Sequence, residues 1–312
     1  MNSKKNQKTQ KIQGSRIKRS TGEKIFDSVN VIFLAIFSFT TFYPFWYVLI
    51  RSLNTGRDAL KGGIWFLPRE FTWENYTFAF NDARIFRSLG VSVFITVALI
   101  VLSLFFTCMV AYAMSIKYFP GRSLFAFYWY FTTMFGGGMI PYFLLLRTLG
   151  LNKSIWLYII PEIYSFSKFI MIRTYFQNIP YELRESAEMD GAGHLKTMMK
   201  IYMPLAKPML ATQGLMIGVS QWNSWYTGVY YQAKAELQPA ASVLKMMMTE
   251  ATASLAEAEA KGDVIRLGKM VTYTSESIQY AFVMILTIPI IIAYPFVQKY
   301  FVKGMLVGSV KG

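Results

Sequence analysis

Side chains that commonly carry catalysis or bind metals are scarce in this sequence. It contains one histidine, His194, and one cysteine, Cys108. Zinc sites and Ser–His or Cys–His nucleophiles need several such side chains in one place, so neither kind of site is expected. The stretch from Gly262 to Lys269 resembles a phosphate-binding loop only superficially, because five residues instead of four separate its glycines and Met270 follows the lysine. The sequence therefore predicts no metal site, no catalytic residue and no ATPase site of its own.

Amide and aromatic side chains within an apolar stretch, residues 208–233, indicate a different chemistry. Amides form hydrogen bonds with polar solutes, and aromatic rings stack on apolar faces of a solute. If the stretch lies in a membrane, its polar residues are costly and often functional. The candidate residues of a translocation path are Gln213, Gln221, Trp222, Asn223, Trp225 and Tyr226. Two plainer interpretations stay open, which are hydrogen bonding to neighbouring helices and aromatic anchoring at the membrane surface.

The composition is that of a membrane protein. Of the 312 residues, 54% are hydrophobic and only 16% are charged, and the mean hydropathy is +0.33. Soluble domains have about 25% charged residues. The net charge of +15 would indicate nucleic acid in a soluble chain, but eight of the 32 lysines and arginines lie in residues 1–24, ahead of an apolar run. This pattern is typical of a cytoplasmic tail beside a membrane span, and nucleic acid is not an expected partner.

The apolar windows predict an all-α, polytopic membrane protein with six transmembrane helices. A helix needs about 20 mostly apolar residues to cross the hydrocarbon core. Five charge-free windows meet this length, namely residues 28–50, 88–116, 123–146, 208–233 and 277–298. A sixth window, residues 155–176, is interrupted by Glu162 and Lys168, each of which is expected to face a partner subunit, a water-filled cavity or the membrane surface.

The lysine and arginine distribution predicts that both termini are cytoplasmic. Residues 1–27 then form a basic cytoplasmic tail, and residues 28–312 form a six-helix transmembrane domain. Two external loops are long: residues 51–87, which look ordered, and residues 234–276, where strong helix formers around 250–260 predict a surface helix. The largest cytoplasmic connection is residues 173–207.

This cytoplasmic connection is expected to contain two short helices joined by a sharp turn. Glu182 and Glu185 complement the positive end of the first helix dipole, and Gly191 and Gly193 can end that helix by adopting a positive φ. In the second helix, four apolar residues at helical spacing define one face: Leu195, Met198, Met199 and Tyr202. Such a helix can insert into a groove of another protein, or it can lie along the membrane surface.

The run from Glu185 to Ala192, followed by Ile201, Met203 and Pro204, resembles the EAA loop of permease subunits in binding-protein-dependent ABC importers. Ser186 stands at the usual position of alanine, and Met203 at that of leucine. The resemblance implies that this loop docks on an ATPase subunit through Glu185, Ser186, Ala187, Asp190, Gly191 and Ala192. Gln221-Trp222-Asn223 and residues 294–304 are similar to permeases of the oligosaccharide and polysaccharide-fragment group.

The resemblance implies a permease of the type I ABC importer fold in a bacterial cytoplasmic (inner) membrane. The expected partners are a second homologous permease, two ATPase subunits that bind the ATP, an extracytoplasmic sugar-binding protein and the lipid bilayer. The permease itself is then not an enzyme, and its cargo is a sugar, with an oligosaccharide as the expected class.

Two rival functions stay open at this point. A secondary transporter or channel driven by an ion gradient would need several carboxylates within the spans, and only Glu162 lies there. A membrane scaffold without transport activity gives no reason for the polar residues in the fifth span.

Overall fold

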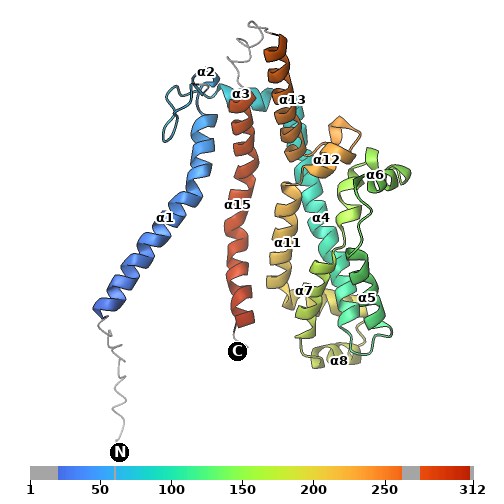
Figure 1. The fold of residues 1–312 in the computed structure, drawn as a ribbon. Helices are drawn as coiled ribbons and strands as arrows, with labels where there is room; N and C mark the ends of the chain where they lie inside the picture. Colours follow the sequence, from blue (N-terminus) through green and yellow to red (C-terminus); the bar gives the residue numbers. More distant parts are fainter. Residues whose placement is uncertain (1–19, 60, 262–274, 310–312) are drawn as a thin grey trace, which may run out of the picture. The chain divides into compact units, whose positions relative to one another are not determined.

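The computed structural model describes residues 20–59, 61–261 and 275–309 (Figure 1). These residues are mostly helical and contain no β-strand beyond an isolated bridge between Asn54 and Phe71. The described α-helices are α1 (Thr21–Ser52), α2 (Gly56–Ala59), α3 (Glu74–Asn81), α4 (Ala83–Ser115), α5 (Arg122–Thr133), α6 (Met139–Thr148), α7 (Phe166–Gln177), α8 (Glu182–Met189), α9 (His194–Thr197), α10 (Met203–Leu205), α11 (Lys207–Trp222), α12 (Tyr226–Tyr231), α13 (Ala240–Lys261) and α15 (Ser275–Ser309). Short 3-10 turns lie at Leu151–Lys153, Ile155–Tyr158, Ile160–Glu162 and Ala235–Leu237. The phosphate-loop-like stretch from Gly262 onwards lies outside the described residues.

Residues 1–47 form a unit of their own, separate from residues 48–312. Within it, α1 begins at Thr21, inside the segment predicted to be the tail. The Ser20 hydroxyl accepts a hydrogen bond from the Glu23 backbone N–H, and the Glu23 carboxylate accepts one from the Ser20 N–H, which is a capping box. The aliphatic and aromatic side chains along this part of α1, from Ile25 to Phe45, are largely exposed, as expected of a helix surrounded by lipid or by a partner subunit.

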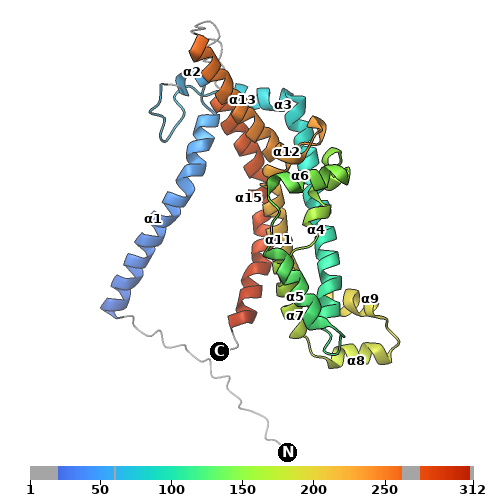
Figure 2. The same cartoon turned by 45° about the vertical axis from the view of Figure 1, so that its right-hand side comes forward.

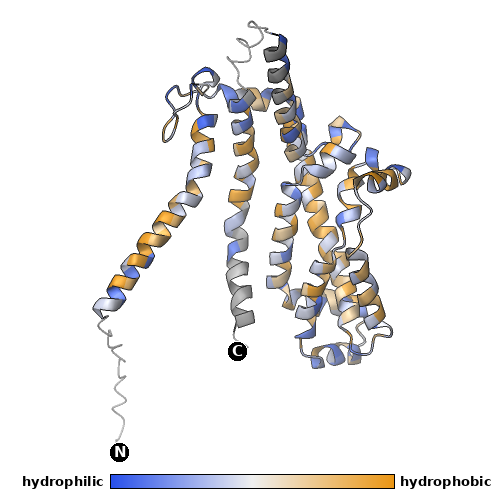
Figure 3. Cartoon of the chain, in the orientation of Figure 1, coloured by the Kyte–Doolittle hydropathy of each residue, from blue (hydrophilic) through white to orange (hydrophobic). Residues whose placement is uncertain are grey.

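Two described helices, α1 and α4, are long and apolar enough to cross a membrane. The 3-10 turns of Ile155–Glu162 and helix α7 become a third if they count as one span bent by 50°. The window of residues 277–298 lies within α15, and Figure 3 shows the apolar residues along these helices. The six-span arrangement with cytoplasmic termini stays a prediction.

Two of the predicted windows are not continuous helices. Residues 123–146 are divided into α5 and α6 by an extended segment at Phe135–Gly138, where Gly138 has a φ of 81°. Residues 208–233 are divided into α11 and α12 at Asn223–Trp225. The three consecutive glycines explain the break between α5 and α6. Glycine disfavours a helix, and Gly138 adopts a backbone conformation that other residues avoid.

Helix α4 is the central packing element of residues 48–312. It packs against α7 on one side and against α11 on another, and α15 packs against α11 and α13 (Figures 1 and 2). Gly214 and Gly218 of α11 face α4, where a Cβ atom on Gly218 would lie 3.0 Å from the Ile100 side chain. Small residues four apart allow two membrane helices to approach closely, and this pair sets the distance between α11 and α4.

The segment between α1 and α4, which was predicted to be an ordered external loop, is ordered; its external location stays a prediction. The buried Asn54 side chain accepts hydrogen bonds from the backbone N–H groups of Arg69 and Glu70, both at 2.9 Å, and donates one to Asp58 at 3.1 Å. Arg69 Nε also donates to Asp58 at 3.0 Å. Burial would raise the pKa of Asp58, but the hydrogen bonds from Asn54 and Arg69 outweigh it and hold that pKa below its ordinary value.

The predicted surface helix around residues 250–260 is the second half of α13, which begins at Ala240. The first half of α13 packs against α12 at Gly228, which is buried. A Cβ atom on Gly228 would lie 2.1 Å from the Ser242 hydroxyl oxygen and 2.6 Å from Gln238 Oε1. The Gln238 amide donates to the Gly228 carbonyl at 2.9 Å, and this bond keeps the Gln238 side chain close to the glycine. There is therefore no room for a side chain at residue 228.

Replacing Gly228 with alanine is expected to destabilise the protein by about 1–3 kcal/mol, because the added methyl group overpacks the α12–α13 contact. The measurement is thermal unfolding of the purified chain in detergent. Gly90→Ala is the matched control, since a Cβ atom at Gly90 would meet nothing within 4 Å. Equal unfolding temperatures for the two variants would contradict the close approach.

Candidate functional site

The inner face of α8 contains a buried arginine. Arg184 is 8% exposed, and its Nε donates to the more exposed Glu188 Oε1 at 2.7 Å, one helical turn further on. Burial alone would lower the pKa of Arg184, but the bond to Glu188 outweighs it and raises that pKa. Ala187 is buried on the same face, and Glu182 and Glu185 lie in the first turn, as the sequence predicted. Arg184 therefore stays charged although it is buried on the inner face of α8.

The turn after α8 has the geometry that Gly191 was predicted to provide. Gly191 has a φ of 72°, its N–H donates to the Glu188 carbonyl at 3.0 Å, and the Ala192 N–H donates to the Ala187 carbonyl at 2.9 Å. These two bonds form a Schellman motif with glycine at the left-handed position. The same prediction for Gly193 was wrong, because Gly193 has a φ of −70° and precedes α9 as its N-cap residue.

The second half of the loop divides its apolar residues between two faces. Helix α9 continues through a π-helical segment, Met198–Tyr202, into α10. Met198 and Tyr202 are buried, whereas Leu195 and Met199 are about half exposed. The prediction of one shared apolar face was therefore wrong in part. A π-helical turn holds more residues than an α-helical turn, so the spacing that places four residues on one α-helical face does not hold here.

Tyr202 anchors the loop to the helical bundle. Its ring packs edge-to-face against Tyr112 of α4, with the ring centres 4.9 Å apart, and against Phe176 of α7, with the centres 5.3 Å apart. Met198 and Ala206 belong to the same buried cluster. Figure 2 shows α8 and α9 at the end of the molecule where α7 also ends. A displacement of the loop must therefore be transmitted to α4 and α7.

The exposed side of the loop combines charged and apolar side chains. Met189 at the end of α8 is 88% exposed, and Leu195 of α9 and Met199 of the π-helical segment are about half exposed. An open depression of about 700 Å³ is lined by Gly193, His194, Leu195, Lys196, Met199 and Lys200. Of the predicted docking residues, Glu185, Ser186, Asp190 and Gly191 are exposed, Ala192 is half-buried and Ala187 is buried. This surface can bind a partner protein.

Three of the six residues predicted for a sugar path are buried between helices. Gln213 donates to the Met171 sulfur at 3.1 Å, and Trp222 Nε1 donates to the Leu286 carbonyl of α15 at 3.0 Å. Gln221 is 7% exposed. The side chains of Gln213 and Trp222 thus contact neighbouring helices in this structure.

The other three residues lie at the break between α11 and α12 and are exposed. The Asn223 side-chain amide donates to the Val219 carbonyl at 2.8 Å. Trp225 and Tyr226 are about 40% exposed, and their rings lie 5.9 Å apart. Tyr230 extends this aromatic surface at 4.7 Å from Tyr226.

Sequence reasoning missed a cation at this surface. Lys245 of α13 places its ammonium group 5.4 Å from the centre of the Trp225 ring. The two residues come from different helices, so no local motif connects them. Glu162 and Lys168 do not pair through their side chains, as expected from their spacing: Lys168 Nζ lies 3.4 Å from the Glu162 backbone carbonyl.

A family model described as "Binding-protein-dependent transport system inner membrane component" matches residues 122–307, a range that includes the whole two-helix loop. The chain belongs to this family. It is therefore a permease of a binding-protein-dependent ABC importer and a component of the inner membrane. Its role is transport rather than enzymatic catalysis.

Similar proteins agree with this assignment over nearly the whole chain. Protein LplC of Bacillus subtilis is 34% identical over 93% of this chain and 96% of its own length. The polygalacturonan/rhamnogalacturonan transport system permease YtcP of the same organism is also 34% identical, over 93% and 99% respectively. One chain in the crystal structure of a bacterial ABC transporter that imports the acidic polysaccharide alginate is 32% identical, with a TM-score of 0.79 over 91% of this chain and 99% of that chain.

Substitution of Gly191 by alanine is expected to destabilise the loop by about 1–2 kcal/mol, because a Cβ atom disfavours the left-handed conformation. No atom lies within 4 Å of the added Cβ, so the effect is conformational rather than steric. Gly193→Ala is the control, since Gly193 has a negative φ and equally open surroundings. Hydrogen exchange over residues 182–192 measures how stable the loop is in each variant. Equally fast exchange in Gly191→Ala and Gly193→Ala would contradict the stabilising role of the Schellman turn.

Proposed function

We propose that this chain forms, with a second homologous permease, the translocation path of an ATP-driven importer whose cargo is an oligosaccharide. An extracytoplasmic binding protein delivers the cargo, and two partner ATPase subunits bind and hydrolyse ATP. The observation that carries the proposal is the two-faced loop of α8 to α10. One face is buried against α4 and α7, and the other is exposed and includes the apolar side chains of Met189, Leu195 and Met199.

The loop is suited to transmit motion from an ATPase to the spans. Tyr202 and Met198 fix its inner face between α4 and α7, and the Arg184–Glu188 pair, one turn apart, supports the helical form of α8. Met189, Leu195 and Met199 supply the apolar contact area that a groove on a partner can cover. When the ATPase subunits close, they pull the loop, and α4 and α7 move with it.

Six spans with cytoplasmic termini fit the observed breaks. Broken helices are tolerated at membrane depth where they are buried in protein or line a cavity. In the proposed arrangement, the pairs α5–α6 and α11–α12 and the bent segment ending in α7 are three broken spans. The three remaining spans are α1, α4 and α15. The surface at Asn223, Trp225 and Tyr226 follows directly after one break and can therefore line the path.

The exposed surface at the α11–α12 break supports a sugar cargo. Trp225 and Tyr226 offer ring faces for sugar C–H groups, and Asn223 offers an amide for hydroxyls. Lys245 adds a positive charge beside the Trp225 ring, which suits a sugar that carries a carboxylate. The names of the similar proteins, which include polygalacturonan and alginate transport, favour the same class, an acidic oligosaccharide.

Affinity purification of the tagged chain from its source organism, grown on pectic or alginate material, tests the coupling surface. The wild-type chain is expected to copurify with a second permease and an ATPase. Met189→Glu places a charge on the exposed apolar face and is expected to lose the ATPase while it keeps the second permease, which serves as an internal folding control. A wild-type chain that purifies alone and transports sugar into liposomes without ATP would instead establish a secondary transporter.

Replacement of Trp225 with alanine is expected to reduce ATP-dependent uptake by roughly tenfold, because a stacking face for the sugar is lost. Tyr128→Ala is the control, since Tyr128 is 61% exposed and lies on α5, a helix that packs against α7. Uptake is measured in proteoliposomes of the whole importer with oligosaccharides of polygalacturonan, arabinan and alginate. Equal uptake by the two variants would remove the α12 surface from the path.

A further inference from the structure

A second cavity, of about 410 Å³, lies between the connection of α4 to α5, the end of α7 and helix α8. Its volume is within the range of small-molecule sites. Three cationic residues line it, Lys117, Arg122 and Arg184, together with polar groups that include Ser115 and Tyr181. No carboxylate lines it. The cavity is thus basic, and its walls come from segments that are far apart in sequence.

The positive charge at this cavity is only partly neutralised by the protein. Arg184 is paired with Glu188, but neither Lys117 nor Arg122 forms a salt bridge with any of the described residues. Arg173, on α7, lies close enough to Arg122 for their positive charges to repel each other. A bound anion would relieve this repulsion, and a group with several acceptor oxygens can serve more than one cation at once.

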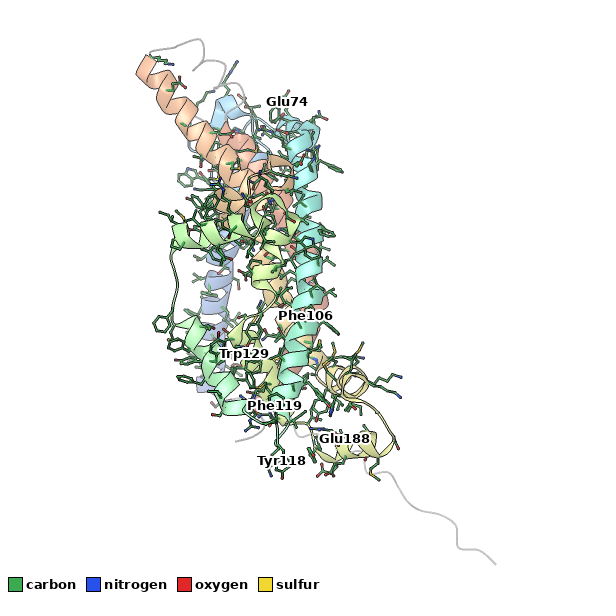
Figure 4. The ribbon with its side chains drawn as sticks, turned by 90° about the vertical axis from the view of Figure 1, so that its right-hand side faces the viewer. Glu74, Phe106, Tyr118, Phe119, Trp129 and Glu188 are labelled. Carbon is green, nitrogen blue, oxygen red and sulfur yellow. The ribbon has the colours of Figure 1, made fainter. Side chains whose placement is uncertain are left out.

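The surroundings of the cavity indicate that the anion belongs to a lipid. The cavity lies where α4 ends and α5 begins, at the end of the long apolar helix. Helix α5 has no buried residue, and its side chains next to Arg122 are apolar and exposed, with Leu124 at 70% and Phe127 at 63%. Acyl chains can lie along this face while the headgroup reaches the cations. Figure 4 shows Tyr118, next to Lys117 in the chain, and Glu188 of α8 at the same end of the molecule.

We propose that this cavity binds the phosphate group of an anionic phospholipid through Lys117 and Arg122. Arg184 of α8 lines the same cavity. Basic pockets between membrane helices bind anionic headgroups, and a net negative lipid satisfies the unpaired charges better than a zwitterionic one. The lipid then contacts both the α4–α5 connection and α8, so it stiffens the segment that transmits motion to the spans. The proposal does not depend on which substrate is imported.

Native mass spectrometry of the full chain in detergent, with phosphatidylglycerol or phosphatidylcholine added, tests this site. The wild-type chain is expected to retain phosphatidylglycerol on the order of tenfold more strongly than phosphatidylcholine, given about 1 kcal/mol for each Lys or Arg at an anionic lipid. The double variant Lys117→Gln and Arg122→Gln is expected to lose this preference. Both side chains are at least partly exposed, so folding is preserved.

The matched control is the double variant Lys24→Gln and Lys207→Gln, which removes the same charge from exposed positions outside the cavity. An unchanged preference in the cavity variant, or an equal loss in the control, would overturn the proposal. Inorganic phosphate that binds the wild-type chain but not the cavity variant, and that added phosphatidylglycerol does not displace, would assign the cavity to a free anion. If the bound ATPase subunits abolish the preference for phosphatidylglycerol, the cavity is part of the surface that the ATPase covers, and the lipid proposal is wrong.

Discussion

The contact on which the rest of the structure depends is the packing of Tyr202 between Tyr112 and Phe176. Edge-to-face contacts of this kind are directional, and they stabilise beyond the area that they bury. They attach the loop of α8 to α10 to two helices of the bundle, α4 and α7. In the proposed mechanism, a partner that bound the loop without this attachment would move the loop alone. With it, the same motion reaches α4, which packs against the glycines of α11.

The two faces of the loop explain why its sequence combines features that conflict in an ordinary helix. Helix α8 has a buried arginine on its inner side, which pairs with Glu188, and a nearly fully exposed methionine, Met189, one residue beyond that glutamate. In an isolated globular protein an exposed apolar surface of this kind is a liability, and it indicates an interaction site. The burial of Arg184 and Ala187 determines which side of α8 faces the bundle, so that Met189 is presented to the outside.

The local features of the molecule were the ones that the sequence predicted well. Gly191 was predicted because a left-handed turn has a residue signature, and the ordered segment between α1 and α4 was predicted from its composition. The polar–apolar pattern also predicted a membrane protein. Three of the windows lie largely within the long helices α1, α4 and α15, whereas the six-span count stays a prediction. Length and charge do not tell where a helix breaks, although the Gly136–Gly138 break has a local signal.

Features that depend on tertiary packing were missed. The pairing of Lys245 with Trp225 joins α13 to the α11–α12 break, and no spacing rule connects the two residues. Met198 and Tyr202 are buried whereas Leu195 and Met199 are exposed, because a π-helical segment changes the spacing of the residues. Such a segment has no sequence signature. The same limit applies to the candidate sugar-path residues. An amide such as Gln213 looks the same in the sequence whether its side chain faces a translocation path or forms a hydrogen bond with a neighbouring helix.

The hydrogen-bonded connection between α1 and α4, built on Asn54, is fixed within the chain itself. Asn54, Asp58 and Arg69 hold the backbone of this connection, and the Asn75 side chain ties it to α3. A partner that binds a flexible loop must overcome the entropy lost when that loop becomes ordered, whereas a preorganised loop avoids this cost. Any contact made by this connection therefore needs only a few side chains to be specific, and it can be weak enough to form and break repeatedly.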